Sequence, residues 1–188
     1  RAAQLARLRV RGVENTALAL EDLGTGAAPT HVLEDLLIAD STADCEPNPD
    51  PTPRICGTLD LRGKSRTRGA RWEVEGRGLR LLRLNDAATL QATDVRLAGA
   101  ASSKLLAMEN SASVELERFV LRGQGVCVDF QGPDPEARPG LQLSKGRLDC
   151  ETSFETGCQF EGQEALREVL VQSNRGLRCV HPLQQLGR

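Results

Sequence analysis

The sequence predicts an all-β parallel β-helix solenoid of about seven rungs, because one short pattern recurs seven times along the chain. Each copy contains two apolar columns two positions apart, as expected of a strand with one buried face. The copies are 28, 36, 23, 24, 27 and 23 residues apart. Strands this short cannot bury an apolar face alone, so equivalent strands of successive copies are expected to stack in parallel. The first column is Leu8, Leu36, Trp72, Val95, Phe119, Gly146 and Val169, and the second is Val10, Ile38, Val74, Leu97, Leu121, Leu148 and Val171.

A turn follows each of these strands, and a second strand follows the turn in most copies. Glycine in the turn column is expected to adopt positive φ. The turn column is Gly12, Asp40, Gly76, Gly99, Gly123, Cys150 and Ser173. The second strands are indicated by Leu18/Leu20, Leu59/Leu61, Leu79/Leu81, Leu106/Met108, Val126/Val128, Cys158/Phe160 and Leu177/Cys179. A third, weaker strand is indicated by Leu90/Ala92, Val114/Leu116 and Leu141/Leu143. Three parallel sheets wound into a coil are therefore expected.

A charged residue precedes the first apolar column in every copy. Its sign alternates from rung to rung nearly throughout, so stacking would place opposite charges next to each other, each pair contributing roughly 0.2–1 kcal/mol. A different register would lose both the apolar stacks and this alternation. The charged column is Arg7, Asp35, Arg71, Asp94, Arg118, Lys145 and Glu168.

Two other folds would also give alternating apolar residues. An antiparallel β-sandwich or barrel would use tight hairpins, but the chain contains no Asn-Gly or Asp-Gly dipeptide. A leucine-rich repeat would repeat an asparagine at a fixed core position and would include a helical stretch, and neither recurs here. The stacked β-helix therefore remains the favoured prediction.

Six cysteines, an even number, favour an oxidising compartment and disulfide bonds. Cys45 and Cys56 bracket a proline-rich loop and are expected to pair, and Cys150 and Cys158 bracket a second turn and are expected to pair likewise. The pairing of Cys127 and Cys179 stays open. Alternation places Cys127 outward and Cys179 inward, two rungs apart, and rungs spaced ~4.8 Å would hold the two too far apart for a disulfide. No Cys-x-x-Cys motif suggests a metal site, and none is predicted.

Composition limits the partners and the location of the protein. The net charge of −2 is spread along the chain, which argues against a nucleic-acid partner. No apolar run approaches the length of a membrane span. The chain lacks an N-terminal Met and a signal-peptide pattern, so residues 1–188 are interpreted as one domain cut from a longer, secreted or cell-surface protein. High usage of Arg, Leu and Ala with little Lys suggests a GC-rich bacterial genome.

Two proline-rich insertions, residues 40–57 and 130–140, leave the repeat pattern. Solenoids place such insertions on a surface, often one that binds a ligand. Their charged side chains are the candidate binding residues, against the simpler interpretation that the insertions are tolerated excursions without a role. These residues are Glu46, Asp50, Arg54, Asp134, Glu136 and Arg138.

The repeated units at 114–128 and 166–180 resemble those of the right-handed parallel β-helix repeat proteins, the pectin-lyase-like superfamily. The resemblance covers essentially the whole chain and implies a right-handed coil, in line with the usual crossover rule. Members of the superfamily include polysaccharide lyases and hydrolases, surface adhesins and phage tailspikes. The units are specific for the fold and nearly silent about function.

Candidate catalytic groups are sparse. The superfamily's lyases and hydrolases need converging carboxylates in one groove, whereas the outward columns of this chain mix both signs. His31 and His181 lie far apart along the repeat, and Trp72, the one residue suited to a sugar platform, sits in a core column. No catalytic residue, cofactor or metal is predicted.

The sequence therefore favours a non-catalytic module, a rigid scaffold for adhesion or for binding a protein or polysaccharide. The alternative is a carbohydrate-active enzyme of the β-helix class, a lyase or hydrolase that has lost activity or retains it. A third hypothesis is an oligomerising fibre segment. An uncapped β-helix end exposes backbone and core, so homo-oligomerisation or end-to-end contact with flanking domains is also expected.

Overall fold

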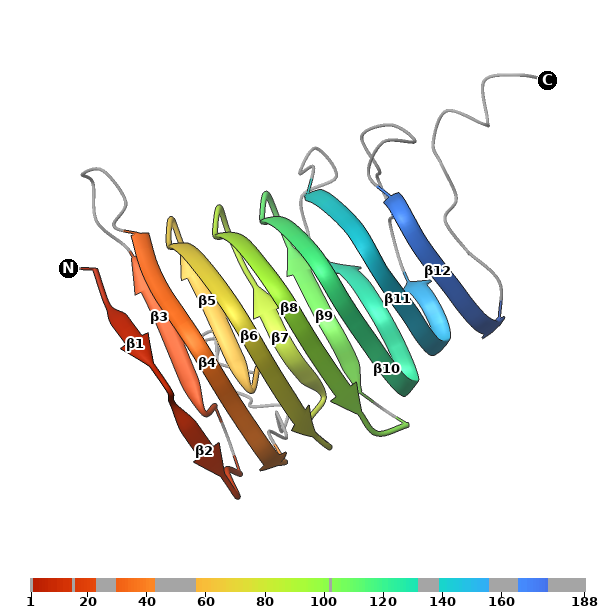
Figure 1. The fold of residues 1–188 in the computed structure, drawn as a ribbon, viewed down its shortest axis with the longest axis horizontal. Helices are drawn as coiled ribbons and strands as arrows, with labels where there is room; N and C mark the ends of the chain where they lie inside the picture. Colours follow the sequence, from red (N-terminus) through yellow and green to blue (C-terminus); the bar gives the residue numbers. More distant parts are fainter. Residues whose placement is uncertain are drawn as a thin grey trace, which may run out of the picture.

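The computed structural model describes residues 2–14, 16–22, 30–42, 57–101, 103–131, 139–155 and 166–175. Their regular structure is entirely β, with no helix among them (Figure 1). The strands are β1 (Gln4–Ala6), β2 (Arg9–Arg11), β3 (Leu18–Asp22), β4 (Thr30–Ser41), β5 (Leu59–Gly63), β6 (Arg66–Gly76), β7 (Arg80–Leu84), β8 (Thr89–Gly99), β9 (Lys104–Glu109), β10 (Ser113–Gln131), β11 (Gly140–Glu155) and β12 (Leu166–Arg175).

Every strand pairing is parallel, and the strands stack as a β-solenoid, which confirms the predicted fold class. One side of the coil is the stack β1/β2, β4, β6, β8, β10, β11 and β12, and the other is β3, β5, β7 and β9, continued by the second halves of β10 and β11 (Figure 1). The coil has about five turns, slightly fewer than the seven rungs predicted. The first level of the first stack is short, because β1 and β2 have only three residues each.

The predicted columns of the first strand are confirmed by the register. Leu36 pairs with Trp72, Trp72 with Val95, and Val95 with Phe119. In the second column Val10 pairs with Ile38, and the stack continues through to Leu148 and Val171. Residues of these two columns are buried in the inner rungs and form the core between the walls.

The predicted third strand does not stand apart; it is the first half of each long strand. Leu90 and Ala92 begin β8, which then bends at Asp94 and continues as the first predicted strand. The bend is one residue in the left-handed region, and in every rung it is the residue of the charged column: Arg7 (φ 58°), Asp35 (53°), Arg71 (58°), Asp94 (56°), Arg118 (54°), Lys145 (52°) and Glu168 (54°). Left-handed φ disfavours residues with a Cβ by roughly 1–2 kcal/mol each, so packing and pairing elsewhere in the coil must stabilise these bends.

Trp72 lies in the core, 1% exposed, as its column predicted. Its indole Nε1–H donates to the carbonyl oxygen of Leu33, 2.9 Å away. Gly69 leaves room for the ring, since a Cβ there would lie 2.3 Å from the indole. Trp72 is therefore unavailable as a sugar platform.

The expected positive φ of the turn glycines holds at Gly12, with φ 64°, and is wrong at Gly76, Gly99 and Gly123. The latter two are needed for space: a Cβ at Gly99 would lie 2.5 Å from Leu105, and one at Gly123 would lie 2.9 Å from the Gly99 carbonyl oxygen. Close packing of the corner, rather than backbone conformation, selects glycine at these positions.

The second strand was predicted in the wrong register in two rungs. The pairs that align with Leu59/Leu61 are Leu82/Leu84, Leu106/Met108 and Val128/Phe130, not Leu79/Leu81 or Val126/Val128. The corner before this strand departs from strict alternation, and β10 and β11 shift register between Gly123 and Val126. As a consequence Cys127, predicted to face outward, is fully buried in the core.

The predicted pairing of Cys150 with Cys158 is wrong, because Cys150 forms a disulfide with Cys127. The two Cα atoms lie 5.6 Å apart on adjacent rungs, within the range that a disulfide spans. The cause is the shift of register that turns Cys127 inward, towards the turn column that contains Cys150. Cys45, Cys56, Cys158 and Cys179 lie outside the described residues.

Candidate functional site

The six charged residues predicted to bind a ligand lie outside the described residues, as does most of each insertion. These residues are Glu46, Asp50, Arg54, Asp134, Glu136 and Arg138. The described surface offers three other polar features: the charged column, a groove at the next corner, and a buried ion-pair network on the second wall.

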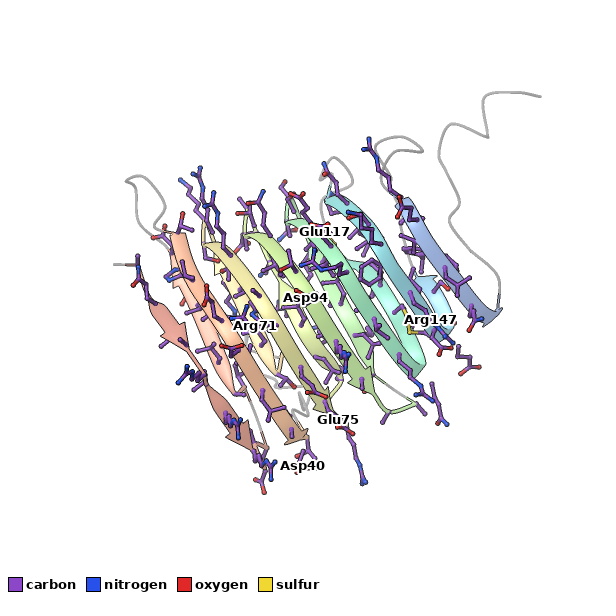
Figure 2. The ribbon with its side chains drawn as sticks, viewed as in Figure 1. Asp40, Arg71, Glu75, Asp94, Glu117 and Arg147 are labelled. Carbon is purple, nitrogen blue, oxygen red and sulfur yellow. A yellow bond between two sulfur atoms is a disulfide. The ribbon has the colours of Figure 1, made fainter. Side chains whose placement is uncertain are left out.

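The charged column forms the predicted ion pairs between rungs. Arg118 donates from Nε to Asp94 Oδ1 at 2.8 Å and from a terminal nitrogen to Oδ2 at 2.9 Å, a two-bond arrangement. Arg71 binds Asp35 in the same way, and Figure 2 shows Arg71 and Asp94 lying along the same line across the strands. The hydrogen bond from Arg118 lowers the pKa of Asp94, and that from Arg71 lowers the pKa of Asp35.

The alternation fails once, where Arg118 and Lys145 are neighbours of the same sign. Glu117 compensates: it accepts a hydrogen bond from Lys145 Nζ at 3.0 Å and lies 3.4 Å from Arg118. The hydrogen bond from Lys145, followed by its charge, lowers the pKa of Glu117. The charges of this corner are thus largely engaged with one another, which leaves the corner poorly suited to bind a highly charged ligand.

The second feature is an open groove of about 690 Å³ at the corner where the first strands end. We call it the glycine groove, and it is lined by Asp40, Ser41, Thr42, Glu75, Gly76, Arg77, Ala98, Gly99, Ala100, Arg122, Gly123, Gln124 and Asp149. The lining comes from five successive rungs, β4 to β11, so at ~4.8 Å per rung the groove is roughly 20 Å long.

Ala98, Gly99 and Ala100 line the groove on its middle rung. The rungs on either side of it contribute the charged residues Glu75, Arg77 and Arg122. A second hollow of about 660 Å³ shares Gly123, Gln124 and Asp149 with it and continues onto Val171 and Gln172 of β12. The two hollows together follow the coil axis over six rungs, and this length is suited to an extended ligand.

Asp40 and Glu75 are the carboxylates at the first end of the glycine groove. Figure 2 shows them side by side at the ends of β4 and β6. They lie on adjacent rungs because Ser41 pairs with Gly76. Both side chains are exposed, and neither forms an ion pair with any of the described residues. Within the described part of the chain, neither carboxylate has a charged partner that a ligand would have to displace.

Sequence reasoning missed this pair because it aligned Asp40 itself with Gly76. A bulge between Ile38 and Ser41 adds one residue to β4, and Asp40 takes the left-handed conformation, φ 56°. A one-residue bulge leaves no pattern of its own in a single sequence. The groove itself could have been predicted from the recurring glycines of the turn column, because stacked glycines leave a strip of surface without side chains.

At the far end of the groove the charges are partly engaged. Asp149 accepts a hydrogen bond from Arg147 at 2.9 Å and lies 4.0 Å from Arg122. The side chain of Arg122 is 77% exposed and extends into solvent. A ligand in the groove would therefore meet charges of both signs towards each end: Asp40, Glu75 and Arg77 at the first, and Arg122 and Asp149 at the other.

The third feature is a buried ion-pair network on the second wall. Asp60, fully buried, lies 3.3 Å from Arg83 and 3.1 Å from Arg62. Arg83 also donates two hydrogen bonds to Glu109, at 2.9 and 2.6 Å. Burial disfavours the charge of the Arg83 guanidinium, but the hydrogen bonds and charges of Glu109 and Asp60 outweigh it and raise the pKa of Arg83. The network is closed to solvent and serves the structure.

His31 is also structural, because its Nδ1 accepts a hydrogen bond from the backbone N–H of Ala3, 3.1 Å away. Its side chain is buried, and this burial lowers the pKa of the imidazole. The bond ties the first residues of the chain to β4.

Within the described ranges, no group of three or more His, Cys, Asp and Glu side chains is placed to hold a metal ion. No helix there is long and apolar enough to span a membrane. Comparison with protein-family models, with curated proteins and with solved structures found no match to this chain. The geometry of the surface therefore carries the functional argument.

Proposed function

We propose that this chain is a non-catalytic module of a secreted or cell-surface protein, a rigid scaffold that binds an extended polysaccharide along the glycine groove. The observation that carries the proposal is the groove itself, an open strip crossing successive rungs, with two carboxylates at one end that form no ion pair with the described residues. A ligand with a repeating unit could make similar contacts on successive rungs.

The scaffold supports the proposal through its rigidity. The groove is built on strand ends whose backbone is fixed by parallel pairing on both sides, from β6 to β10. A binding surface that needs no ordering loses less free energy when it binds. This is an advantage for a shallow groove, which can offer only a few contacts per rung.

The chemistry of the groove favours a hydroxyl-rich ligand. Asp40 and Glu75 accept hydrogen bonds, Arg77 and Arg122 donate them, and Gln124 does both. The mixture of both signs argues against a strongly anionic polymer. The described residues that line the groove include no aromatic side chain, so their contacts with a ligand would be hydrogen bonds rather than ring stacking.

The disulfide supports a location outside the cytosol. Cys127 and Cys150 are bonded, and disulfides persist in oxidising compartments. A module on the cell surface or in a secreted protein would meet both polysaccharide and protein partners.

A glycan-array experiment followed by titration calorimetry tests the proposal. Binding to at least one polysaccharide is expected, and the double variant Glu75→Ala/Arg122→Ala should weaken it by about tenfold or more, equivalent to about 1.4 kcal/mol. The matched control is Glu73→Ala/Arg96→Ala, which removes the same charges from exposed positions that do not line the groove. Equal affinities of the two double variants, or no glycan bound by the unaltered chain, would contradict the proposal, and binding of an extended peptide instead would identify a protein ligand.

One observation favours a second candidate, a glycoside hydrolase. The paired carboxylates Asp40 and Glu75 lie on adjacent rungs, and retaining hydrolases use two carboxyl groups roughly 5 Å apart. Incubation with the polysaccharide that binds, followed by a reducing-end assay, separates the candidates. Release of reducing ends that is abolished by both Asp40→Asn and Glu75→Gln would establish the hydrolase, and no release would leave the binding module.

A further inference from the structure

The first and last of the described strands are the edges of the same parallel sheet. In the described residues β1 and β2 pair only with β4, and β12 pairs only with β11 (Figure 1). Each edge strand therefore has one side without a strand partner. Such an edge can accept another strand through its backbone N–H and C=O groups.

The apolar columns are also less buried at the first and last rungs than in the middle of the coil. Leu8 and Val10 at the first rung, and Val169 and Val171 at the last, are only partly buried, whereas Leu36 and Ile38 one rung inward are at most 2% exposed. Each end thus presents a partly buried apolar strip that an added rung would cover.

The register of the two ends matches. Val169 belongs to the column of Leu8, and Val171 to the column of Val10, and all strands run parallel. A second copy moved along the coil axis would therefore place its β12 against β1 and β2 in the same register that joins neighbouring rungs within the chain.

The charges of the two ends are complementary. Arg7 occupies the charged column at the first rung and Glu168 at the last, and both are exposed. Strict alternation over seven positions would give both ends the same sign. The alternation is broken once, where Lys145 follows Arg118 and Glu117 compensates for the like charges. Because of this one break, the last charge of the column is opposite in sign to the first. A stacked second copy would thus continue the alternation, with Glu168 next to Arg7.

We propose that copies of this chain associate head to tail, with β12 of one copy pairing in parallel with β1 and β2 of the next. Val169 then packs on Leu8, Val171 on Val10, and Glu168 forms an ion pair with Arg7. The contact joins two different surfaces, so it does not close after two copies and extends into a filament. This contact uses none of the residues that line the glycine groove, although Val171 also lines the second hollow beside it.

Sedimentation velocity over a range of concentrations at low salt tests this proposal. The unaltered chain should form species that grow with concentration, and Arg7→Glu or Glu168→Arg alone should reduce the association at least about tenfold, because each places like charges in contact. The double variant Arg7→Glu/Glu168→Arg should restore it. The control Arg96→Glu reverses an exposed charge on an inner rung and should leave association unchanged.

Thermal unfolding of each variant by circular dichroism shows whether it is folded before association is compared. A chain that stays monomeric at every concentration would overturn the proposal. So would a dimer that does not grow, or assemblies that neither single variant weakens. Glycan binding is measured separately, so failure of head-to-tail association leaves the proposed function intact.

Discussion

Gly146 lies directly against the ring of Phe119, and the ring fills the space that a side chain at Gly146 would occupy. A Cβ at residue 146 would lie 2.3 Å from two ring carbons of Phe119. The two residues occupy the same core column on adjacent rungs. The glycine that seems to break the column in the sequence is therefore the complement of the large residue on the next rung.

Gly146→Ala should destabilise the protein by about 1–3 kcal/mol, because the buried ring of Phe119 has little room to move. Urea denaturation measures the effect. The double variant Gly146→Ala/Phe119→Leu should lose less unfolding free energy than the two single variants lose in sum, since the smaller side chain relieves the clash. Strict additivity of the two substitutions would show that the residues do not compete for this space.

Stability should fall in acid because of the charged column. The pKa values of Asp35, Asp94 and Glu117 are lowered in the folded state, from ordinary values of 3.8 for Asp and 4.5 for Glu. A carboxyl with a lowered folded pKa stabilises the folded state at any pH above its unfolded pKa and loses that contribution as pH falls through its folded pKa. The melting temperature should thus change little between about pH 7 and pH 5 from this source and decline below about pH 4.

The variant Asp35→Asn/Asp94→Asn provides the control for this pH dependence. It should be less stable than the unaltered chain at neutral pH and should lose less stability on acidification. Parallel melting curves for the two proteins across the acid range would show that other carboxyl groups govern the acid response.

Arg83→Met should destabilise the chain by roughly 1–3 kcal/mol, because it removes one of the two guanidinium groups that bind the buried Asp60 and both hydrogen bonds that Arg83 donates to Glu109. Arg68→Met, at an exposed position of β6, should change stability by less than about 0.5 kcal/mol. Chemical denaturation of both variants gives the comparison. Similar small losses at the two positions would mean that solvent reaches the network.

Peptide mapping under non-reducing conditions should recover Cys127 linked to Cys150. The link closes a loop with a sequence separation of 23 residues, so Cys127→Ala/Cys150→Ala should lower the free energy of unfolding by about 3 kcal/mol. Recovery of Cys150 linked to Cys158 would contradict the structure and restore the pairing expected from the sequence.

The columns of the first strand could be predicted because burial repeats there at fixed spacing. Trp72, Val95 and Phe119 share the same inward position, and the charged residue that precedes each one is set by the same register. The fold and the ion-paired column therefore followed from periodicity. The left-handed backbone of that column did not, because Arg, Lys and Glu rarely adopt it and no glycine marks it.

The candidate site was less predictable, for two physical reasons. The bulge before Ser41 and the irregular corner before Leu82 each change the alternation by local backbone geometry, which apolar patterning does not record. The burial of Asp60 and Arg83 depends on ion pairing between rungs. A charged residue is predicted to be exposed when its partner cannot be identified from the sequence. The groove at Asp40 and the network at Arg83 were both missed on these grounds.

The Cys127–Cys150 bond has a mechanical consequence. Each rung contacts mainly its neighbours, so a pull applied to the two ends of the coil loads the rungs in series and unzips them singly. The covalent link joins β10 to β11 and makes their rungs one mechanical unit. Under tension the oxidised protein should unfold in fewer steps than the reduced protein, because two rungs would have to detach together. The segment between Cys127 and Cys150 would also stay closed, so the redox state of this bond would limit the length of the fully extended chain.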